Sequence, residues 1–345
     1  MALLLFRPEQ FTKLYDCSRV NISEVPLLER QGIINGTAML ILFFVFEILY
    51  LPCVVAIWKH REHSCYKFLF FIGILDILML PIQGLVSALY SFFGVVPCSF
   101  LTFNFIIGSF SLSFFAAQTS ANLFLALDRL IDTIFPKFAK FLFSNSRPWL
   151  WTMASSAFGL YYFIWVKPSF FSPTNGNWFM NPYQDFTNIS VNIEDYVDPI
   201  ITYYNAFLSF GFPFIYVIFV LSFLRKLRKN YGNGQNVTKT TTVTFITQQN
   251  VVLFQKVQPK NNCATSNTNL TKILFVQVAA VNGINVATFV LFTLMQNLPM
   301  SKPLIVVGFY FNYLMFGFPP IIYLLVNRTI RNECRKIFKK IIKLL

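Results

Sequence analysis

Seven long runs of apolar residues, separated by polar segments, dominate the sequence. They cover roughly residues 33–58, 68–91, 99–127, 149–166, 199–224, 273–296 and 304–326. Each run is close to or above the ~20 residues that an α-helix needs to cross the hydrocarbon of a bilayer. A β-strand would leave backbone groups unpaired in lipid, and a barrel would show short alternating segments instead. The pattern therefore predicts an all-α membrane protein, a bundle of seven transmembrane helices.

Polar segments flank and interrupt the predicted bundle, which spans 33–326. Residues 1–32 form an N-terminal segment, and residues 225–272 form a long third connection, rich in Asn, Thr, Gln and Lys, whose composition is typical of disorder. In the tail 327–345, seven Lys and Arg residues surround one apolar helical face. We expect a short amphipathic helix lying on an anionic lipid leaflet, with Cys334 as a candidate for palmitoylation.

The placement of the basic residues predicts an orientation. The 345 residues are 55% hydrophobic and 12% charged, with a formal net charge of +14. Twenty-two Lys and Arg lie in the connections 59–67, 128–148 and 225–272 and in the tail, against six in the N-terminal segment and the alternate connections. Such a bias marks the cytoplasmic side of a membrane and differs from the basic face of a nucleic-acid-binding protein. We therefore expect an extracellular N-terminus and no nucleic acid partner.

The expected outer side carries candidate modification sites. Asn21 and Asn188 each begin an Asn-Ile-Ser sequon and are candidates for glycosylation. Among the six cysteines, only Cys17 and Cys98 are placed for an external disulfide. The sequence leaves open whether these two are bonded.

Catalysis is not expected from this sequence. It contains two His and neither a Gly-x-Ser-x-Gly nor a His-Glu-x-x-His motif. His60, His63 and Cys65 are metal-type ligands, but such a group in a short basic connection is more often a solvated loop. We expect no enzyme activity, no cofactor and no metal site.

Acidic residues inside the predicted spans are candidates for function, because ionisable groups are costly in hydrocarbon. Only Glu47 and Asp76 qualify. Asp76 lies about 12 Å into the second helix and is tolerable there only if it faces the bundle. It is either a polar node that rearranges between helices or a hydrogen-bonded packing residue, whereas Glu47 is better explained by packing.

The third predicted helix carries an ordered polar face. Its members recur at helical spacing, at Asn104, Gly108, Ser111, Phe115, Gln118 and Asn122. Small and polar residues on such a face also serve simple helix packing, which is the alternative explanation. Its outer part, with Asn104, Gly108 and Ser111, is our candidate floor for a ligand pocket.

Two features stand at the inner ends of helices. Asp128 and Arg129 close the third helix, and the acid offers the base a charged partner where an interfacial Arg would otherwise extend towards water. Such a pair can act as a two-state switch. Pro319 and Pro320 remove amide donors near the inner end of the seventh helix and should kink it.

An Asp-Arg pair closing helix three, a Pro-x-x-Tyr motif (Pro320 to Tyr323) closing helix seven and an outer N-terminus together resemble G-protein-coupled receptors. More specifically, the chain resembles the nematode serpentine receptor class T chemoreceptors. The matching stretches are EILYLPC at 47–53, SCYK at 64–67 with Gly73 and Asp76, Lys167-Pro168 with WFMNP at 178–182, and GFPPIIYLLVNRTIR at 317–331.

The resemblance implies chemosensory signalling through a heterotrimeric G protein at a plasma or ciliary membrane. It also implies that Asp128, Arg129, Pro320 and Tyr323 form the activation and coupling switch. Leu130 and Pro319 depart from rhodopsin-like receptors, which commonly have Tyr and Asn there. The connection 167–198 contains no Cys, so the usual partner of a Cys at the outer end of helix three is absent.

We expect the ligand to be a small, mostly apolar molecule held between helices three, five, six and seven. Two other classes compete with a receptor. A seven-span ligand-gated ion channel would place the N-terminus inside, and epitope tags on intact cells would distinguish it. A small-solute transporter would show inverted repeats and charged residues at mid-membrane, and no repeat is visible here.

Overall fold

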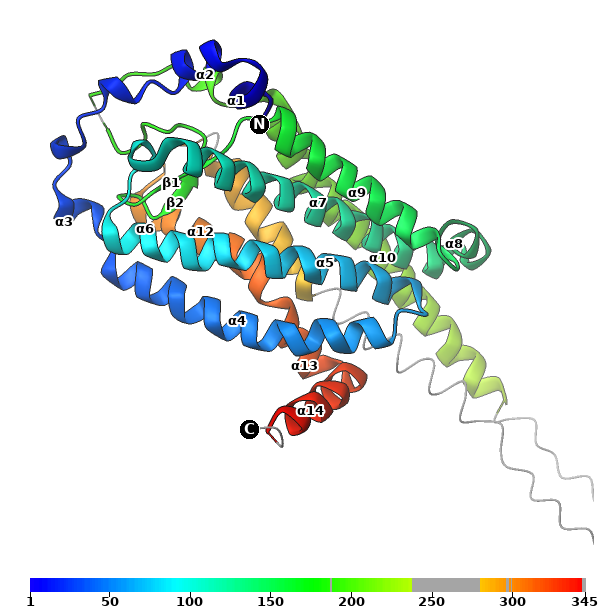
Figure 1. Ribbon diagram of the computed structural model, residues 1–345. Coiled ribbons are helices and arrows are strands. Elements are labelled where there is room, and N and C mark those ends of the chain that lie inside the picture. Colours follow the sequence, from blue (N-terminus) through cyan, green and yellow to red (C-terminus); the bar gives the residue numbers. More distant parts are fainter. Residues whose placement is uncertain (187, 238–279, 296–297, 299, 343–345) are drawn as a thin grey trace, which may run out of the picture.

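The chain folds into a bundle of helices that runs back and forth between two ends (Figure 1). The computed structural model describes residues 1–186, 188–237, 280–295, 298 and 300–342. The bundle contains α4 (Ile33–Lys59), α5 (Ser64–Leu80) continued through a π-helical turn (Pro81–Val86) into α6 (Ser87–Phe93), α7 (Leu101–Ile134), α9 (Arg147–Trp165), α10 (Pro199–Val237), a helix over Ala280–Met295, and α12 (Lys302–Gly317) followed by α13 (Pro319–Val326).

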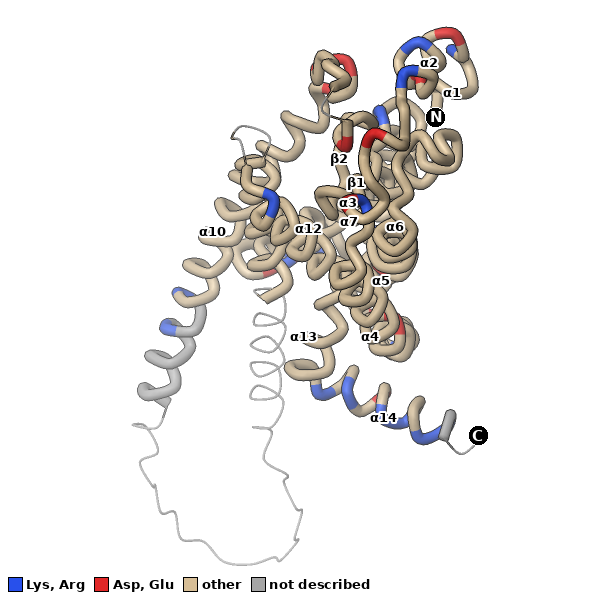
Figure 2. Tube along the Cα trace, turned by 90° about the vertical axis from the view of Figure 1, so that its left-hand side faces the viewer, with Lys and Arg blue, Asp and Glu red and all other residues tan. Residues whose placement is uncertain are grey.

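Shorter elements mark the two ends of the bundle. At one end lie α1 (Ala2–Phe6), α2 (Pro8–Leu14), α3 (Leu27–Arg30), 3-10 turns at Cys17–Arg19, Ile22–Glu24, Pro97–Phe100 and Ile193–Asp195, and an antiparallel hairpin of β1 (Phe170–Ser172) and β2 (Asn177–Phe179). We call this the capped end. At the other lie the α4–α5 turn, α8 (Pro136–Phe143) and α14 (Arg328–Ile342). We call this the basic end, because Figure 2 shows Lys and Arg along α14 and on the lower part of α10.

Several helices are long and apolar enough to cross a bilayer. Within the described residues, the stretches Leu27–Lys59, Ser64–Phe93, Pro97–Ile134 and Pro199–Arg225 meet this condition alone. A fifth span is the pair α12 and α13, which bends by 50° at its junction. The 19-residue α9 and the shorter apolar helix Ala280–Met295 complete the bundle. The bend lies where Pro319 and Pro320 predicted a kink.

The predicted helix ranges agree with the structure near their centres and differ at their ends. Helix α7 continues to Ile134 and α10 to Val237, beyond the predicted ends at 127 and 224. Hydropathy detects only the part of a helix that fits the bilayer, whereas Leu, Lys and Arg also favour helix beyond it. The predicted third connection 225–272 therefore begins as helix. Its part from residue 238 onwards lies outside the described residues, as do residues 273–279 of the predicted sixth helix.

Aromatic side chains fill the centre of the bundle. Five buried Phe residues from four helices lie in one apolar cluster: Phe46, Phe212, Phe289, Phe309 and Phe316. Other Phe side chains point outward, among them Phe210 and Phe214 of α10, which are 75% and 67% exposed. A soluble protein would not expose such a stripe, whereas a helix facing lipid does so at no cost.

The amphipathic helix predicted for the tail is present as α14. Its apolar residues Ile330 and Cys334 are buried, and Cys334 lies against Cys53 of α4 with their sulfur atoms 3.8 Å apart. Glu333 of α14 pairs with Lys59 of α4 at 3.0 Å. Hydrogen bonds from Lys336 and Lys59 hold the pKa of the Glu333 carboxyl low, at about 2. Helix α14 is therefore docked on the basic end of α4.

Candidate ligand cavity and coupling site

The bundle contains a partly open cavity of about 200 Å³ beneath the capped end. Its walls come from α5 and the π-helical turn, α7, α9, α10, the helix Ala280–Met295 and α12, and its roof comes from the hairpin. Ten of the sixteen described lining residues are apolar or aromatic: Met79, Leu112, Phe115, Tyr162, Trp178, Phe179, Met180, Ile201, Phe292 and Met295. The volume is below the roughly 300–1,000 Å³ of sites for drug-sized ligands. The cavity suits a small molecule with an apolar body.

Besides Asn177 of the hairpin, three amide side chains from the helical walls add polarity to the lining. Gln83, Asn205 and Asn312 line the cavity from the π-helical turn, α10 and α12, and are only 1%, 5% and 7% exposed. Their carbonyl oxygens have no hydrogen-bond partner within the described chain. Each unpaired buried polar atom costs about 1–3 kcal/mol, which a bound donor would recover. No acidic or basic side chain stands among the lining residues that the structure describes.

The β-hairpin roof is held inside the mouth of the bundle. The indole Nε1 of Trp178 donates to the Ser87 hydroxyl of α6 at 3.1 Å. The Asn177 amide donates to the Ile305 carbonyl of α12 at 2.9 Å. Both residues also line the cavity. The hairpin is therefore bonded to two sides of the bundle and closes the cavity towards the capped end.

A buried acid supports the loop that follows β1. One carboxylate oxygen of Asp185 accepts hydrogen bonds from the hydroxyls of Ser172, at 2.5 Å, and Thr174. The other oxygen is buried without a partner in the described residues. Burial raises the pKa of the Asp185 carboxyl, and the bonds from Ser172 and Thr174 oppose that rise. The geometry of the roof therefore depends on a carboxyl that is costly to ionise.

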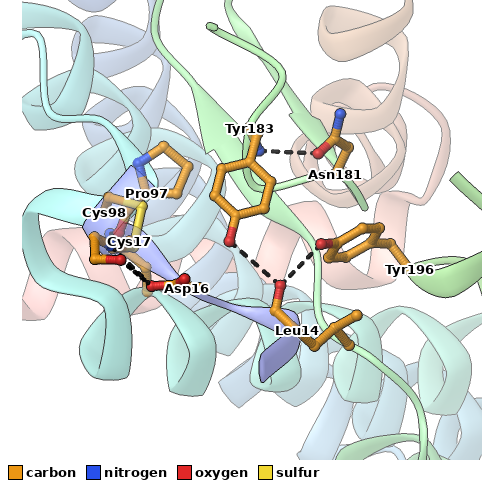
Figure 3. Close-up of a disulfide and its surroundings, with 10 residues drawn as sticks. Leu14, Asp16, Cys17, Pro97, Cys98, Asn181, Tyr183 and Tyr196 are labelled. Carbon is orange, nitrogen blue, oxygen red and sulfur yellow. Dashed lines mark hydrogen bonds between the residues drawn. A yellow bond between two sulfur atoms is a disulfide. The ribbon is translucent and has the colours of Figure 1, made fainter. Parts of the chain in front are cut away.

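The N-terminal segment covers the roof and is fastened to it (Figure 3). A disulfide joins Cys17 to Cys98, just before α7. The hydroxyls of Tyr183 and Tyr196, from the connection between α9 and α10, both donate to the Leu14 carbonyl, at 3.3 and 2.8 Å. Residues 1–32 and 166–198 thus form one cap, held by a covalent bond and by buried aromatic contacts.

The structure separates the three residues that the sequence assigned to the ligand pocket. All are buried on α7, but only Ser111 lines the cavity. Asn104 accepts a hydrogen bond from the Tyr90 hydroxyl and donates to the Pro97 carbonyl at 2.8 Å, which fixes the start of α7. Gly108 lies against the backbone of Ser169, and a Cβ there would overlap the Ser169 carbonyl oxygen. Gly108 therefore lets the connection pass close to α7.

Asp76 lies inside the bundle, fully buried. The Tyr50 hydroxyl of α4 donates to its carboxylate, and Gln118 of α7 also lies close to it. Tyr323 of α13, itself 1% exposed, is near enough to interact electrostatically with Asp76. Asp76 thus makes polar contacts with three other helices, an arrangement that both a rearranging node and a hydrogen-bonded packing residue would show, and Pro320 is buried one turn before Tyr323.

Asp128 and Arg129 form an ion pair at the basic end of α7. Arg129 Nε donates to Asp128 Oδ2 at 3.0 Å, and its Nη2 makes a second, shorter contact with the same oxygen. The Ser64 hydroxyl of α5 lies 3.3 Å from both carboxylate oxygens, and Arg129 also donates to it at 3.2 Å. The side chains are 3% and 17% exposed. The pair is therefore formed, shielded and tied to a neighbouring helix.

The remaining predicted sites have clear positions. Asn21 and Asn188 are both exposed at the capped end, where Asn188 donates to Glu24. The Cys334 thiol is 1% exposed and packs against α4, so acylation would require α14 to move away from it. No group of three or more His, Cys, Asp or Glu residues suited to a metal ion occurs within the described residues.

The three cavity amides were not identified from the sequence. Gln83, Asn205 and Asn312 are single polar residues within apolar runs, with no repeat at helical spacing. Asn177 and Trp178 of the roof lie in a connection without periodicity. The rarity of amides in apolar helices was the available signal, because a polar side chain in a transmembrane helix usually faces the protein.

Comparison with known proteins agrees with this architecture. The family model described as "Serpentine type 7TM GPCR chemoreceptor Srt" matches residues 2–253 and 233–344, and so nearly the whole chain. The two matched segments meet in the long polar third connection. No curated protein matches the sequence. With its bundle of seven transmembrane helices, the chain belongs to the Srt family of serpentine seven-transmembrane chemoreceptors.

Proposed function

We propose that the protein detects a small chemical cue in the cavity beneath the capped end and activates a heterotrimeric G protein at the basic end. The observation that supports this proposal is that one helix, α7, both lines the cavity and carries the ion pair at the basic end. Ser111 and Phe115 of α7 line the cavity, and the same helix reaches the ion pair of Asp128 and Arg129. A shift of α7 on ligand binding would therefore act on the pair directly.

The ligand that fits the cavity is small, neutral and mostly apolar. The absence of charged residues among the described lining leaves a fixed charge without a partner, which is costly in an apolar site. The unpaired oxygens of Gln83, Asn205 and Asn312 favour a molecule with one or more hydrogen-bond donors. Ser111 adds a hydroxyl, while Gly108 and Asn104 shape the wall and roof indirectly.

Coupling rests on release of Arg129. In the resting state, Asp128 and Ser64 hold the guanidinium. Activation breaks this pair and frees Arg129 to meet the G protein. The bent junction before Pro320, with Tyr323 near the Asp76 node, is the second moving part, because a kink concentrates bending at one place. A ligand shifts this equilibrium only by binding one state more tightly than the other.

The proposed orientation has the capped end outside and the basic end in the cytoplasm of a sensory cell, at the plasma membrane and its cilium. The distribution of bases supports this orientation. Asn21 and Asn188 then lie on the glycosylated side, and the Cys17–Cys98 bond lies in an oxidising compartment.

The test is signalling in cells that express the receptor, with a panel of volatile and water-soluble odorants and a G-protein readout. Asp128→Asn should raise basal signalling, because the neutral amide holds Arg129 less strongly. Arg129→Ala should abolish the response at unchanged surface expression. Full signalling by Arg129→Ala would refute the coupling role, and failure of every odorant with every G protein offered would refute the receptor function.

A further inference from the structure

A second hollow lies at the basic end, away from the ligand cavity and sharing no lining residue with it. It has a volume of about 570 Å³ and lies between the end of α4, the α4–α5 turn and the start of α5 and α9. Its described lining residues are Trp58, Lys59, Arg61, Glu62, Lys67 and Trp149. Three bases thus meet one acid in a recess walled by two indole rings.

Lys67 is the residue that most clearly lacks a partner for its charge. Its side chain is 8% exposed, and its ammonium donates to the backbone carbonyl of Asn145. Within the described residues, no acidic side chain pairs with it. An ammonium has three donors, and a buried charge is normally paired. An anion from outside the chain would therefore neutralise the buried ammonium of Lys67.

The other bases leave the hollow positive. The Arg61 guanidinium lies over the Trp58 ring, 4.2 Å from its centroid, and donates to the Trp58 carbonyl at 3.1 Å. Arg61 also has no acidic partner among the described residues. Lys59 shares its one partner, Glu333, with Lys336. Glu62 is exposed and forms no ion pair in the described structure; with its carboxylate counted, the lining residues carry three positive charges and one negative charge, so the recess remains positive.

The walls of the hollow indicate a lipid rather than a soluble anion. Trp58 and Trp149 form an aromatic group with Phe70, with centroids 4.5 to 6.5 Å apart. Trp is enriched where a helix leaves the hydrocarbon, at the level of the headgroups. Leu51, Val55 and Trp58 follow one face of α4 and are 55%, 49% and 39% exposed. An apolar stripe thus leads from the lipid-facing surface of α4 into the basic recess.

From this arrangement we propose that the hollow binds the phosphorylated headgroup of an acidic phospholipid. The phosphate lies against Lys67 and Arg61, and the acyl chains follow the exposed face of α4. Basic pockets between transmembrane helices on the cytoplasmic side suit such headgroups. The site goes beyond the proposed function, because it involves neither the ligand cavity nor the ion pair of α7.

The test is binding of dioctanoyl phosphatidylinositol 4,5-bisphosphate to the purified full-length receptor in neutral detergent, measured by native mass spectrometry. Arg61→Gln, a substitution at an exposed residue, should weaken binding about fivefold, which is the contribution of one basic residue near an anionic surface. Combined with Lys67→Gln, the loss should be at least about tenfold. The matched control is Lys339→Gln with Lys340→Gln, which removes two exposed bases of α14 and should change affinity less than about twofold.

Three outcomes would overturn the proposal. Equal losses in the hollow and α14 variants would mean diffuse attraction to a basic surface. Binding of soluble inositol 1,4,5-trisphosphate as tight as that of the lipid would mean a soluble anion site. No binding of either to the wild-type protein would mean that the hollow holds no phosphate. Thermal unfolding of each variant shows whether it is folded. If the variant with Lys67→Gln does not fold, the single variant Arg61→Gln still tests the proposal.

Discussion

At the scale of single residues, Gly108 shows that a sequence pattern can predict which residues are buried without predicting what they contact. The spacing on helix three predicted that Asn104, Gly108 and Ser111 face the bundle, and all three are buried. Their partners lie outside this pattern: Asn104 bonds to Tyr90 and Pro97, and Gly108 contacts the connection 166–198, which has no periodicity to place it. Ser111 therefore lines the cavity, while Gly108 makes room for Ser169.

Gly108→Ala is expected to destabilise the protein, because the new Cβ meets the rigid backbone carbonyl of Ser169. Overpacking of this kind costs about 1–3 kcal/mol. Gly283→Ala is the matched control, since nothing lies within 4 Å of a Cβ there and Ala favours helix by about 1 kcal/mol. Thermal unfolding in detergent should show a lower melting temperature for Gly108→Ala alone. Equal melting temperatures for the two variants would contradict the close approach.

Asp185 should make the cap more stable at acidic pH. Burial raises the pKa of the folded Asp185 carboxyl above the ordinary value of about 3.9. The contribution of this group to the free energy of unfolding is therefore fully present below about pH 3.9 and is lost as the pH rises through the folded pKa. Asp185→Asn stays neutral. The melting temperature of the wild type relative to Asp185→Asn should therefore fall as the pH is raised from about 4 through the folded pKa. Glu194→Gln, an exposed acid in the same connection, serves as the control, and a difference that rose with pH would refute the assignment.

At the scale of elements, apolar runs were sufficient to locate the helices because lipid selects helices by composition alone. The π-helical turn Pro81–Val86 and the hairpin β1–β2 were not predicted. Both depend on partners distant in sequence: Tyr313 of α12 lies against Gly84 in the turn, and Trp178 of the hairpin bonds to Ser87. Local periodicity contains no information on such contacts.

The disulfide is expected to hold the cap on the bundle. Cys17 and Cys98 are 81 residues apart in sequence, and loss of a native disulfide typically costs about 2–5 kcal/mol. Reductant should lower the melting temperature of the wild type and make residues 1–32 easier to cleave with protease. The double variant Cys17→Ser with Cys98→Ser should behave like the reduced protein and no longer respond to reductant. A response to reductant that persists in this variant would place the effect at other cysteines.

At the scale of the whole molecule, hydropathy predicted the seven-helix bundle and the bases predicted its two unlike ends. Which helices touch was beyond prediction, because packing in lipid depends on small residues and on buried polar pairs. Helix α9 illustrates this: a Cβ on Gly159 would come within 2.8 Å of Ala117 on α7, so α9 lies directly against the helix that carries the Asp128–Arg129 ion pair. The cavity, Asp76 and the ion pair also adjoin α7.

The most direct test of the account is the dose–response curve of G-protein activation by one active odorant, for three variants at matched surface expression. Asn205→Leu should shift the half-maximal concentration upward by roughly tenfold with the maximum unchanged, because it removes one hydrogen-bonding group from the cavity. Arg129→Ala should remove the maximum response while ligand binding persists. Phe210→Leu, which faces lipid on the same helix as Asn205, should leave the curve unchanged. The account is contradicted if Asn205→Leu and Phe210→Leu give the same curve as the wild type, or if Arg129→Ala still reaches the full maximum.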